Sequence, residues 1–464
     1  MMAPLMFGGL ILFMLIGYPV AFSLAAVGLA FGWIAIEHGY FSVSLLQALP
    51  ERVFGTIMAN ELLLAIPFFT FMGTILERCG LAEDLLDGIG QLFGSVRGGL
   101  SYAVVLVGAV LGAITGTVAA SVIAMGLISL PIMMRYGYNM RHATGVIAAS
   151  GTITQLIPPS LVLVVLADQL GRSVGDMYAG AIGPSIVQVL LFMVFVLIVS
   201  IVKPAHVPGL PREARTLHGW ALISKCLWAM VPSLVLIFLV LGTILMGLAT
   251  PTEGGAMGAV GAMVLAALHR RLTWKLTWQG MDSTMRITAM VIFILVGSNV
   301  FSLTFRGVDG DLWIEHMLTS LPGGVAGFLI VVNIFVFFLA FFLDFFEIAF
   351  IIIPLLAPVA TKLGIDLIWF GVLLGVNMQT SFMHPPFGFA LFYLRGIAPP
   401  EVKSSDIYWG AIPWVGLQII MCAIVIAWPG LVTSFIDVGP AQDATKIQIE
   451  LPPPEEAPAE IQIK

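Results

Sequence analysis

Two pairs of adjacent prolines interrupt stretches of this chain that are apolar enough to lie in a lipid bilayer. Pro158 and Pro159 lie in QLIPPSLVLV, and Pro385 and Pro386 lie in FMHPPFGFAL. Proline lacks a backbone N–H and costs roughly 3 kcal/mol inside a helix, so each pair should break its helix. A broken helix frees carbonyls that can coordinate a cation, and its new N-terminus offers N–H groups to an anion. The breaks therefore predict a binding site for ions.

Small polar residues accompany both breaks, and two carboxylates lie in another apolar stretch. The polar residues are Thr152, Thr154, Gln155 and Ser160 at the first break, and Gln379, Thr380, Ser381 and His384 at the second. Asp344 and Glu347 lie in FLDFFEIAF, and a carboxylate at the bilayer centre costs about 2.5–3.5 kcal/mol on insertion scales. We expect these two residues to bind a cation or to act in gating; the alternative is that they only cap a helix end.

The elements that would position these residues are membrane-spanning helices. The chain has 464 residues, of which 59% are hydrophobic and 10% charged, and its mean hydropathy is +1.04. Its repeated apolar runs can each cross the roughly 30 Å of bilayer hydrocarbon, which predicts an all-α polytopic membrane protein. No basic cluster is dense enough to neutralise several phosphates, so we expect no nucleic-acid partner.

Two apolar stretches, 99–134 and 325–360, are too long for one crossing and have no charged loop for a second one. Each has polar residues near its middle, which predicts a re-entrant hairpin that enters the membrane and returns on the same side. Irregular backbone at that depth needs surrounding protein or a wet cavity. The two broken helices are predicted at 143–167 and 366–392.

The second half of the chain repeats the spacing of the first. A shift of 227 positions (385 − 158) superimposes the two proline pairs, and it also superimposes Pro131 on Pro358 and Gly137 on Gly364. Five predicted crossings separate the starts of the two units, so the second unit should enter the membrane from the opposite face. This predicts an inverted repeat, a design that secondary transporters use.

The predicted organisation has six parts. They are an N-terminal span with an interfacial segment (1–57), a first repeat (58–202), a cytoplasmic connector (203–226), a scaffold helix pair (227–284), a second repeat (285–436) and a Pro- and Glu-rich tail expected to be disordered (437–464). With non-crossing hairpins, 14 of the 20 Lys and Arg share one side, which the positive-inside rule assigns to the cytoplasm. The outer side keeps Arg52, Arg172, Arg306, Lys362, Lys446 and Lys464.

Five motifs, in this order, are similar to those of a known family. They are LLAIPFFTFMG (63–73), GAITGTVAAS (112–121), GTITQLIPPS (151–160), LGIDLIWFGV (363–372) and HPPFGFALFY (384–393). Together they resemble the large membrane (M) subunit, the DctM-like permease, of tripartite ATP-independent periplasmic (TRAP) transporters, over residues 5 to 436. The resemblance implies an elevator-type transporter of the bacterial inner membrane that takes up an organic acid, such as a 2-oxo acid or dicarboxylate, with Na⁺ as coupling ion. It also implies two partners, a small four-helix membrane subunit and a periplasmic substrate-binding protein.

The resemblance further implies roles for individual residues. It places the first hairpin tip on Thr115, Gly116 and Thr117 and its equivalent on Phe342, Leu343 and Asp344. We expect substrate contacts from Thr117, Ser121, Ser160, Thr380, Ser381 and His384. We expect sodium contacts from Thr115, Gly116, Thr152, Thr154, Asp344, Glu347 and Gln379, and no other metal or cofactor. His384 departs from the Thr that many relatives have before the two prolines.

Other functions are open at this stage. An enzyme is not expected, since the chain has no HExxH or GxSxG motif and no ATP-binding Walker sequence. A proton-coupled anion carrier is the alternative if His384 titrates during transport. A channel is less well supported, although inverted repeats with half-crossing loops also occur in pores.

Overall fold

The computed structural model describes residues 2–115, 117–211, 213, 219–385 and 388–436, and these residues form helices and no strand. Six of these helices are each long and apolar enough to cross a membrane, and bent helix pairs bring the number of possible spans to as many as nine. The prediction of an all-α, multi-pass protein is confirmed. Gly116 and the predicted tail (437–464) lie outside the described residues.

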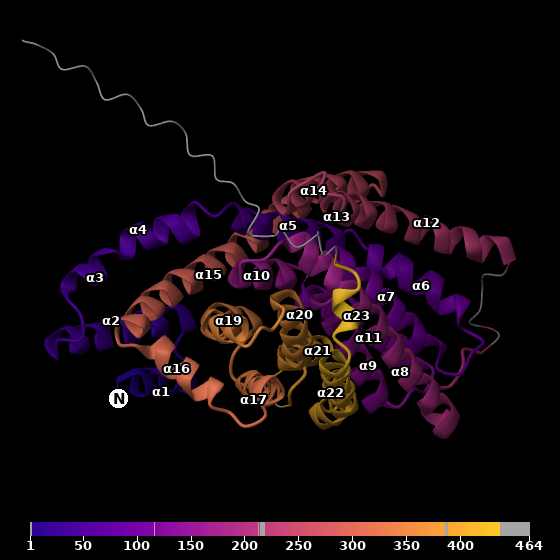
Figure 1. Ribbon diagram of the computed structural model, residues 1–464. Coiled ribbons are helices and arrows are strands. Elements are labelled where there is room, and N and C mark those ends of the chain that lie inside the picture. The colour runs from indigo at the N-terminus through magenta and orange to yellow at the C-terminus, as the bar shows by residue number, and fades with distance from the viewer. Residues whose placement is uncertain (1, 116, 212, 214–218, 386–387, 437–464) are drawn as a thin grey trace, which may run out of the picture.

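The N-terminal helices gather beside one long helix from the second half, α15 (Trp274–Gly307) (Figure 1). They are α1 (Met2–Leu15), α2 (Val20–Glu37), α3 (Val43–Gln47), α4 (Leu49–Val53), the π-helical turn η1 (Phe54–Met58), the 3-10 turn η2 (Glu61–Leu64) and α5 (Ala65–Arg78). Close approach fixes the pairing of α2 with α15, because a Cβ on Gly28 would lie 2.9 Å from the backbone nitrogen of Phe301. Thr304 Oγ1 also donates a hydrogen bond to Gly28 O at 2.9 Å.

The segment 1–57 contains two apolar helices where one span was predicted. α1 ends at Leu15 and α2 begins at Val20. Gly17 between them has a φ of +92°, which a residue with a side chain rarely adopts, and Pro19 is the N-cap of α2. Both residues favour a turn over a continuous helix, and hydropathy alone does not record that difference.

The first half of the molecule contains the first hairpin and the first broken helix. Its elements are α6 (Leu81–Leu92), α7 (Gly99–Thr115), α8 (Val118–Arg135), α9 (Met140–Thr152), the 3-10 turn η3 (Ile153–Gln155), α10 (Leu161–Leu170), α11 (Val174–Val202) and the 3-10 turn η4 (Pro204–His206). The first proline pair falls between η3 and α10, as predicted. Glycine lets α7 lie against this break, since a Cβ on Gly112 would lie 2.9 Å from Cα of Thr154.

In the middle of the chain, two helices run across predicted domain boundaries. This part of the chain contains α12 (Gly219–Ile237), the π-helical turn η6 (Phe238–Gly242), α13 (Thr243–Leu245) and α14 (Pro251–Leu268). α12 begins inside the segment predicted as a connector (203–226), and α15 runs unbroken through the predicted boundary at 284/285. α14 begins with a capping box in which Thr250 Oγ1 accepts from the N–H of Glu253, and Pro251 follows the N-cap.

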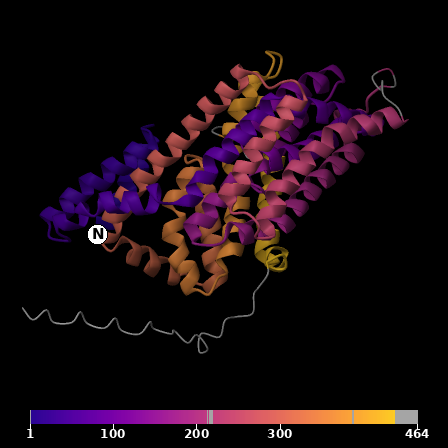
Figure 2. The same ribbon diagram turned by 90° about the horizontal axis from the view of Figure 1, so that it is seen from above.

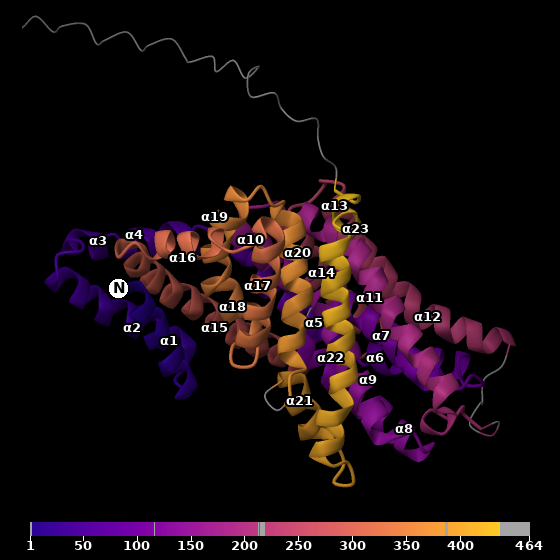
Figure 3. The ribbon, with the colours of Figure 1, turned by 60° about the horizontal axis from the view of Figure 1, so that its bottom comes forward.

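The second half follows the same order of elements as the first. Its elements are α16 (Gly310–Thr319), α17 (Gly324–Leu339), α18 (Phe345–Ile351), α19 (Ile353–Lys362), α20 (Leu367–Met378), the 3-10 turn η7 (Gln379–Phe382), α21 (Phe389–Ile397), α22 (Ser404–Ala427) and α23 (Gly430–Thr433). α18 and α19 meet at a bend of 51°. The second break separates η7 from α21, and Figure 3 shows α20 and α22 side by side.

The two halves join where α9 crosses α22. A Cβ on Gly145 would lie 2.2 Å from the backbone oxygen of Gly410, so glycine is required for this crossing. Beside it, Trp414 is almost fully buried, and its ring makes edge-on contacts with the rings of Phe192 and Phe195. Seen from above, the N-terminal helices and α12 lie at opposite ends of the elongated molecule (Figure 2). The broken helices therefore lie between these ends.

Candidate functional site

The two helix breaks meet inside the protein. Thr152 is the last residue of α9, and its Oγ1 lies 3.7 Å from Sδ of Met383 in the second break. Gln418 of α22 donates from Nε2 to both atoms, at 3.1 Å to Thr152 Oγ1 and 3.8 Å to Met383 Sδ. These three residues are buried, and they come from segments up to 266 positions apart.

The hydroxyl groups of the first break bond to backbone atoms that lie close to them in the chain. Thr152 Oγ1 donates to Ala149 O and Thr154 Oγ1 to Gly151 O, both at 2.9 Å. Ser160 caps α10, since its Oγ accepts from the N–H of Val162 at 3.2 Å. The predicted polar residues of this break therefore stabilise its irregular backbone in the described conformation.

The second break has the same arrangement. Thr380 Oγ1 donates to Asn377 O and Ser381 Oγ donates to Met378 O, both at 2.7 Å. These hydroxyl groups are buried, as is Ser121 in α8. The sequence placed polar side chains at both breaks, and the structure shows that most of their hydrogen bonds are local.

Several amide atoms near the breaks are buried and lack a hydrogen-bond partner among the described residues. They are both polar atoms of Gln379, Oε1 of Gln155 and Oε1 of Gln418. An unpaired buried polar group costs about 1–3 kcal/mol, so such groups usually serve a bound water or ion. Their oxygens, together with the carbonyls at the breaks, are donors that suit an alkali cation. Within the described chain, no three His, Cys, Asp or Glu residues come together as a site for a transition metal.

A cavity of about 410 Å³ is lined by residues of both segments that were predicted to be hairpin tips. The first tip contributes Thr117 and the start of α8, and the second contributes the segment from Asp344 to Glu347. Gln155 of the first break also lines it. The remaining walls are Leu161, Val162, Ile287, Met290, Phe382, Phe389 and Tyr393. The structure therefore brings three of the predicted site residues, Thr117, Asp344 and Glu347, to one cavity.

The other predicted residues do not reach this cavity. Among the described side chains, its lining includes none of Ser121, Thr152, Thr154, Ser160, Gln379, Thr380, Ser381 and His384. These residues are buried, and Thr152 lies where the two breaks meet. Gly116 lies outside the described residues, and α7 ends at Thr115.

Asp344 and Glu347 form a capping box at the start of α18. Asp344 Oδ1 accepts from the N–H of Glu347, and Glu347 Oε2 accepts from the N–H of Asp344, both at 2.9 Å. The capping role that the sequence left as an alternative is therefore present. The same carboxylates line the cavity, so capping and ion binding are compatible roles for them.

The imidazole ring of His384 lies between two phenylalanine rings. It stacks on Phe341 with ring centroids 4.1 Å apart, and it contacts Phe337 edge-on at 4.3 Å. The residue is only 1% exposed. In this conformation the ring packs inside the protein and does not touch the space between the tips.

Sequence reasoning did not single out several residues of this region. Gln418 carried a detectable signal, because it is a lone amide in the apolar run VGLQIIM. Ile287 and Met290 carried none, since an apolar residue on a long apolar helix can face lipid, protein or a cavity. Their place in the lining follows only from the packing of α15 against the hairpin tips.

Known proteins resemble this chain both in sequence and in fold. The family model described as "Tripartite ATP-independent periplasmic transporter, DctM component" matches residues 7–431. A C4-dicarboxylate TRAP transporter large permease protein, DctM, from Pseudomonas aeruginosa is 32% identical, over 84% of this chain and 90% of its own length. The 2,3-diketo-L-gulonate TRAP transporter large permease protein YiaN of Escherichia coli is 28% identical, over 88% and 95%. The crystal structure of the Alcanivorax borkumensis YdaH transporter has a similar fold, with a TM-score of 0.59 at 16% identity, over 85% of this chain and 90% of that one.

Proposed function

Because the chain belongs to the DctM component family of tripartite ATP-independent periplasmic (TRAP) transporters, we propose that it takes up a small carboxylate together with sodium ions. As a member of this family it is a large permease subunit of a secondary transporter of organic acids, and not an enzyme. It is a multi-pass protein of the bacterial inner membrane. Two relatives are named for C4-dicarboxylates and for 2,3-diketo-L-gulonate, so the proposed substrate is a dicarboxylate or a 2-oxo acid.

The observation that carries this proposal is the different chemistry of the two hairpin tips that face one cavity. At the first tip, α8 begins at Val118, and its N-cap Thr117 makes no side-chain capping hydrogen bond. The N-terminus of α8 therefore offers partial positive charge and N–H groups to a carboxylate. At the second tip, Asp344 and Glu347 place carboxylate oxygens on the opposite side. One tip thus suits an anion and the other suits a cation.

Sodium fits the groups around the second tip and the breaks. The carboxylates of Asp344 and Glu347 lie near neutral oxygen donors, which include the unpaired Oε1 of Gln155 in the same cavity. Deeper in the protein, the unpaired Oε1 of Gln379 at the second break and the carbonyls of the first break are further oxygen donors. Sodium bound there would compensate buried polar atoms that otherwise have no partner. Thr115 and Gly116 remain proposed contacts by family resemblance.

The proposed mechanism is an elevator movement of an inverted repeat. The elements of the two repeats correspond in order. The pair α7–α8 corresponds to α17–α18–α19, the broken helix α9–η3–α10 corresponds to α20–η7–α21, and α11 corresponds to α22. The tight crossing of α9 and α22 at Gly145 and Gly410 would hold the two hairpins in one moving body. α15 and the N-terminal helices would be the scaffold, since Gly28 packs tightly on α15 at Phe301.

The family also implies partners for this subunit. We assign it a small membrane subunit, a periplasmic substrate-binding protein and the lipid bilayer as surroundings. Large apolar side chains such as Phe22, Trp33 and Trp228 are well exposed, which suits contact with lipid or with another membrane subunit.

Uptake into proteoliposomes tests the proposed function. The permease is reconstituted with its small subunit, and uptake of radiolabelled succinate and pyruvate is measured with the cognate binding protein under an inward sodium gradient. Each charge that moves inward gains about 2.3 kcal/mol per 100 mV. Two or more Na⁺ with the monoanion pyruvate, or three or more with the dianion succinate, should therefore make uptake faster at an inside-negative potential. An equal potassium gradient is the control.

Two results would contradict the proposal. Uptake that is the same in sodium and potassium would exclude sodium coupling, and a dependence on the pH gradient would then favour proton coupling through His384. A current that does not saturate with the acid would instead favour a channel.

A further inference from the structure

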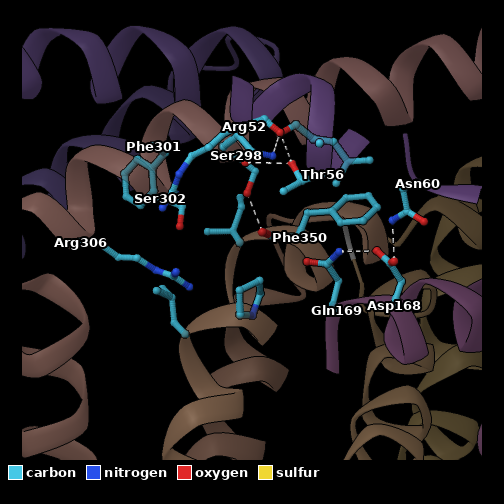
Figure 4. Close-up of a pocket in the computed structure, with 16 residues that line it drawn as sticks. Arg52, Thr56, Asn60, Asp168, Gln169, Ser298, Phe301, Ser302, Arg306 and Phe350 are labelled. Atoms are coloured by element: carbon cyan, nitrogen blue, oxygen red, sulfur yellow. Dashed lines mark hydrogen bonds between the residues drawn. The ribbon is translucent and has the colours of Figure 1, made fainter. Parts of the chain in front are cut away.

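A second polar cavity lies beside the predicted outer half of α15. It has a volume of about 610 Å³ and is lined by α4, η1, the end of α10, α15 and the junction of α18 with α19 (Figure 4). Its lining contains Arg52, at the end of α4, and Arg306, in the last turn of α15. The charge count predicts that both arginines lie on the outer side of the membrane.

One face of α15 supplies most of the polar wall. Leu295, Ser298, Asn299, Ser302 and Arg306 follow one another at helical spacing and all line the cavity. Figure 4 shows the side chain of Arg306 extending from this helix into the cavity. The polar face of α15 is therefore turned toward the protein.

Both guanidinium groups are available to a ligand. Among the described residues, neither Arg52 nor Arg306 takes part in any of the five ion pairs, and neither side chain donates a hydrogen bond. The carboxylate of Asp168, which also lines the cavity, accepts a hydrogen bond at each of its two oxygens. Asn60 Nδ2 donates to its Oδ1 and Gln169 Nε2 to its Oδ2, each at 2.8 Å. Two positive charges thus face a cavity whose acidic group is satisfied by amides.

A short helix separates this cavity from the cavity between the tips. The start of α18, at Asp344, lines the tip cavity, and its last residues, Phe350 and Ile351, line the outer cavity. Seven residues at 1.5 Å each make α18 about 10 Å long. Ser298 Oγ of α15 donates to Phe350 O at 2.6 Å, which holds this end of α18 against α15. The two cavities therefore lie at the two ends of α18.

We propose that the outer cavity is a receiving site for the carboxylate group of the transported acid, which binds between Arg52 and Arg306 before it reaches the hairpin tips. Arginine binds carboxylates through paired N–H groups, and two unpaired arginines in a polar cleft raise the local concentration of anions. This inference rests on the proposed function for the identity of the ligand. Its electrostatic part can be tested without transport.

Thiol labelling of the purified protein tests the inference. A Ser302→Cys substitution places a thiol on the cavity wall, and Ser320→Cys places one on an exposed turn after α16 as a reference. The three native cysteines are buried, and the unsubstituted protein gives the background rate. The rates with the anionic reagent sulfonatoethyl methanethiosulfonate and with its cationic trimethylammonium analogue are compared at each position.

The preference for the anionic reagent should be at least about tenfold greater at Ser302→Cys than at Ser320→Cys. The preference at Ser302→Cys should fall at least about threefold when Arg52→Gln or Arg306→Gln is added. The control is Lys362→Gln, which removes another predicted outer charge that does not line the cavity; the preference should persist in this variant. Succinate or pyruvate at 10 mM should slow the anionic reagent at Ser302→Cys. If that variant does not fold, Thr56→Cys in η1 reports on the same cavity.

Equal preferences at the two positions, or a preference that survives both arginine substitutions, would overturn the inference. A preference without protection by either acid would also overturn it, because the cavity would then attract anions without receiving a carboxylate. Loss of sodium-driven uptake with normal labelling would count against the proposed function and leave this site intact, so the two failures can be told apart.

Discussion

Sodium should stabilise this protein through the carboxylates of the second hairpin tip. Asp344 and Glu347 line the tip cavity and cap α18. A ligand that binds only the folded state adds RT ln(1 + [L]/Kd), which is about 1.4 kcal/mol at 100 mM NaCl for a Kd of about 10 mM. For a large chain this corresponds to a rise in Tm of roughly 1–3 °C. The measurement is a melting curve of the purified permease in NaCl, with equal KCl and choline chloride as references.

An Asp344→Asn substitution should abolish most of the sodium-specific rise. Asparagine is as good an N-cap as aspartate, so α18 keeps its cap while the charge is lost. Asp366→Asn is the matched control, because Asp366 Oδ1 caps α20 by accepting from the N–H of Trp369 at 2.7 Å and does not line the cavity. An unchanged sodium response in Asp344→Asn, or an equal rise in all three salts, would refute the reasoning.

Three further predictions concern the packing and the electrostatics. In chemical unfolding, Gly145→Ala should destabilise the protein by about 1–3 kcal/mol, since its Cβ would lie 2.2 Å from a backbone oxygen of α22. The control Gly416→Ala, which has open space around it, should be neutral or slightly stabilising. Gln418→Leu should change the free energy of unfolding by no more than about 1 kcal/mol, because the loss of the hydrogen bonds to Thr152 Oγ1 and Met383 Sδ is offset by the removal of one unpaired buried oxygen. The substitution should nevertheless reduce uptake. Burial disfavours ionisation of Asp87, yet hydrogen bonds from Lys225 and Gln91 outweigh it and hold the pKa of Asp87 below its usual value of 3.8. The half-exposed Asp87–Lys225 pair should therefore contribute less than about 1 kcal/mol to the free energy of unfolding above pH 4. This contribution is lost as Asp87 is protonated, so the melting curves of Asp87→Asn and the unsubstituted protein should converge as the pH falls below that value.

Much of the secondary structure could be predicted from the sequence. The helices α7 and α8 cover the predicted first hairpin, and Pro158, Pro159 and Pro385 fall where a helix is interrupted. Pro386 lies outside the described residues. Two helices, α12 and α15, run across predicted domain boundaries. α15 crosses the predicted boundary at 284/285 because nothing in its sequence stops a helix there, and α1 and α2 are separate because of a turn at Gly17 that hydropathy does not record.

The candidate site was predictable in its residue types and not in its arrangement. The sequence identified Thr117, Asp344 and Glu347, which the structure brings to one cavity, but it gave the same weight to Thr380 and His384, which lie away from it. It gave no sign that Ile287 and Met290 complete the wall. The two arginines of the outer cavity were visible only as members of the outer charge count.

The sequence by itself determined that the protein is helical, that it spans a membrane and where its helices break. These properties are local, because hydropathy acts over one span and proline acts within one turn. Only the tertiary structure decided which polar side chains share a cavity and which bond to their own backbone. That depends on the rotation of each helix about its axis and on contacts between residues such as Thr152 and Gln418, 266 positions apart, which no local pattern specifies.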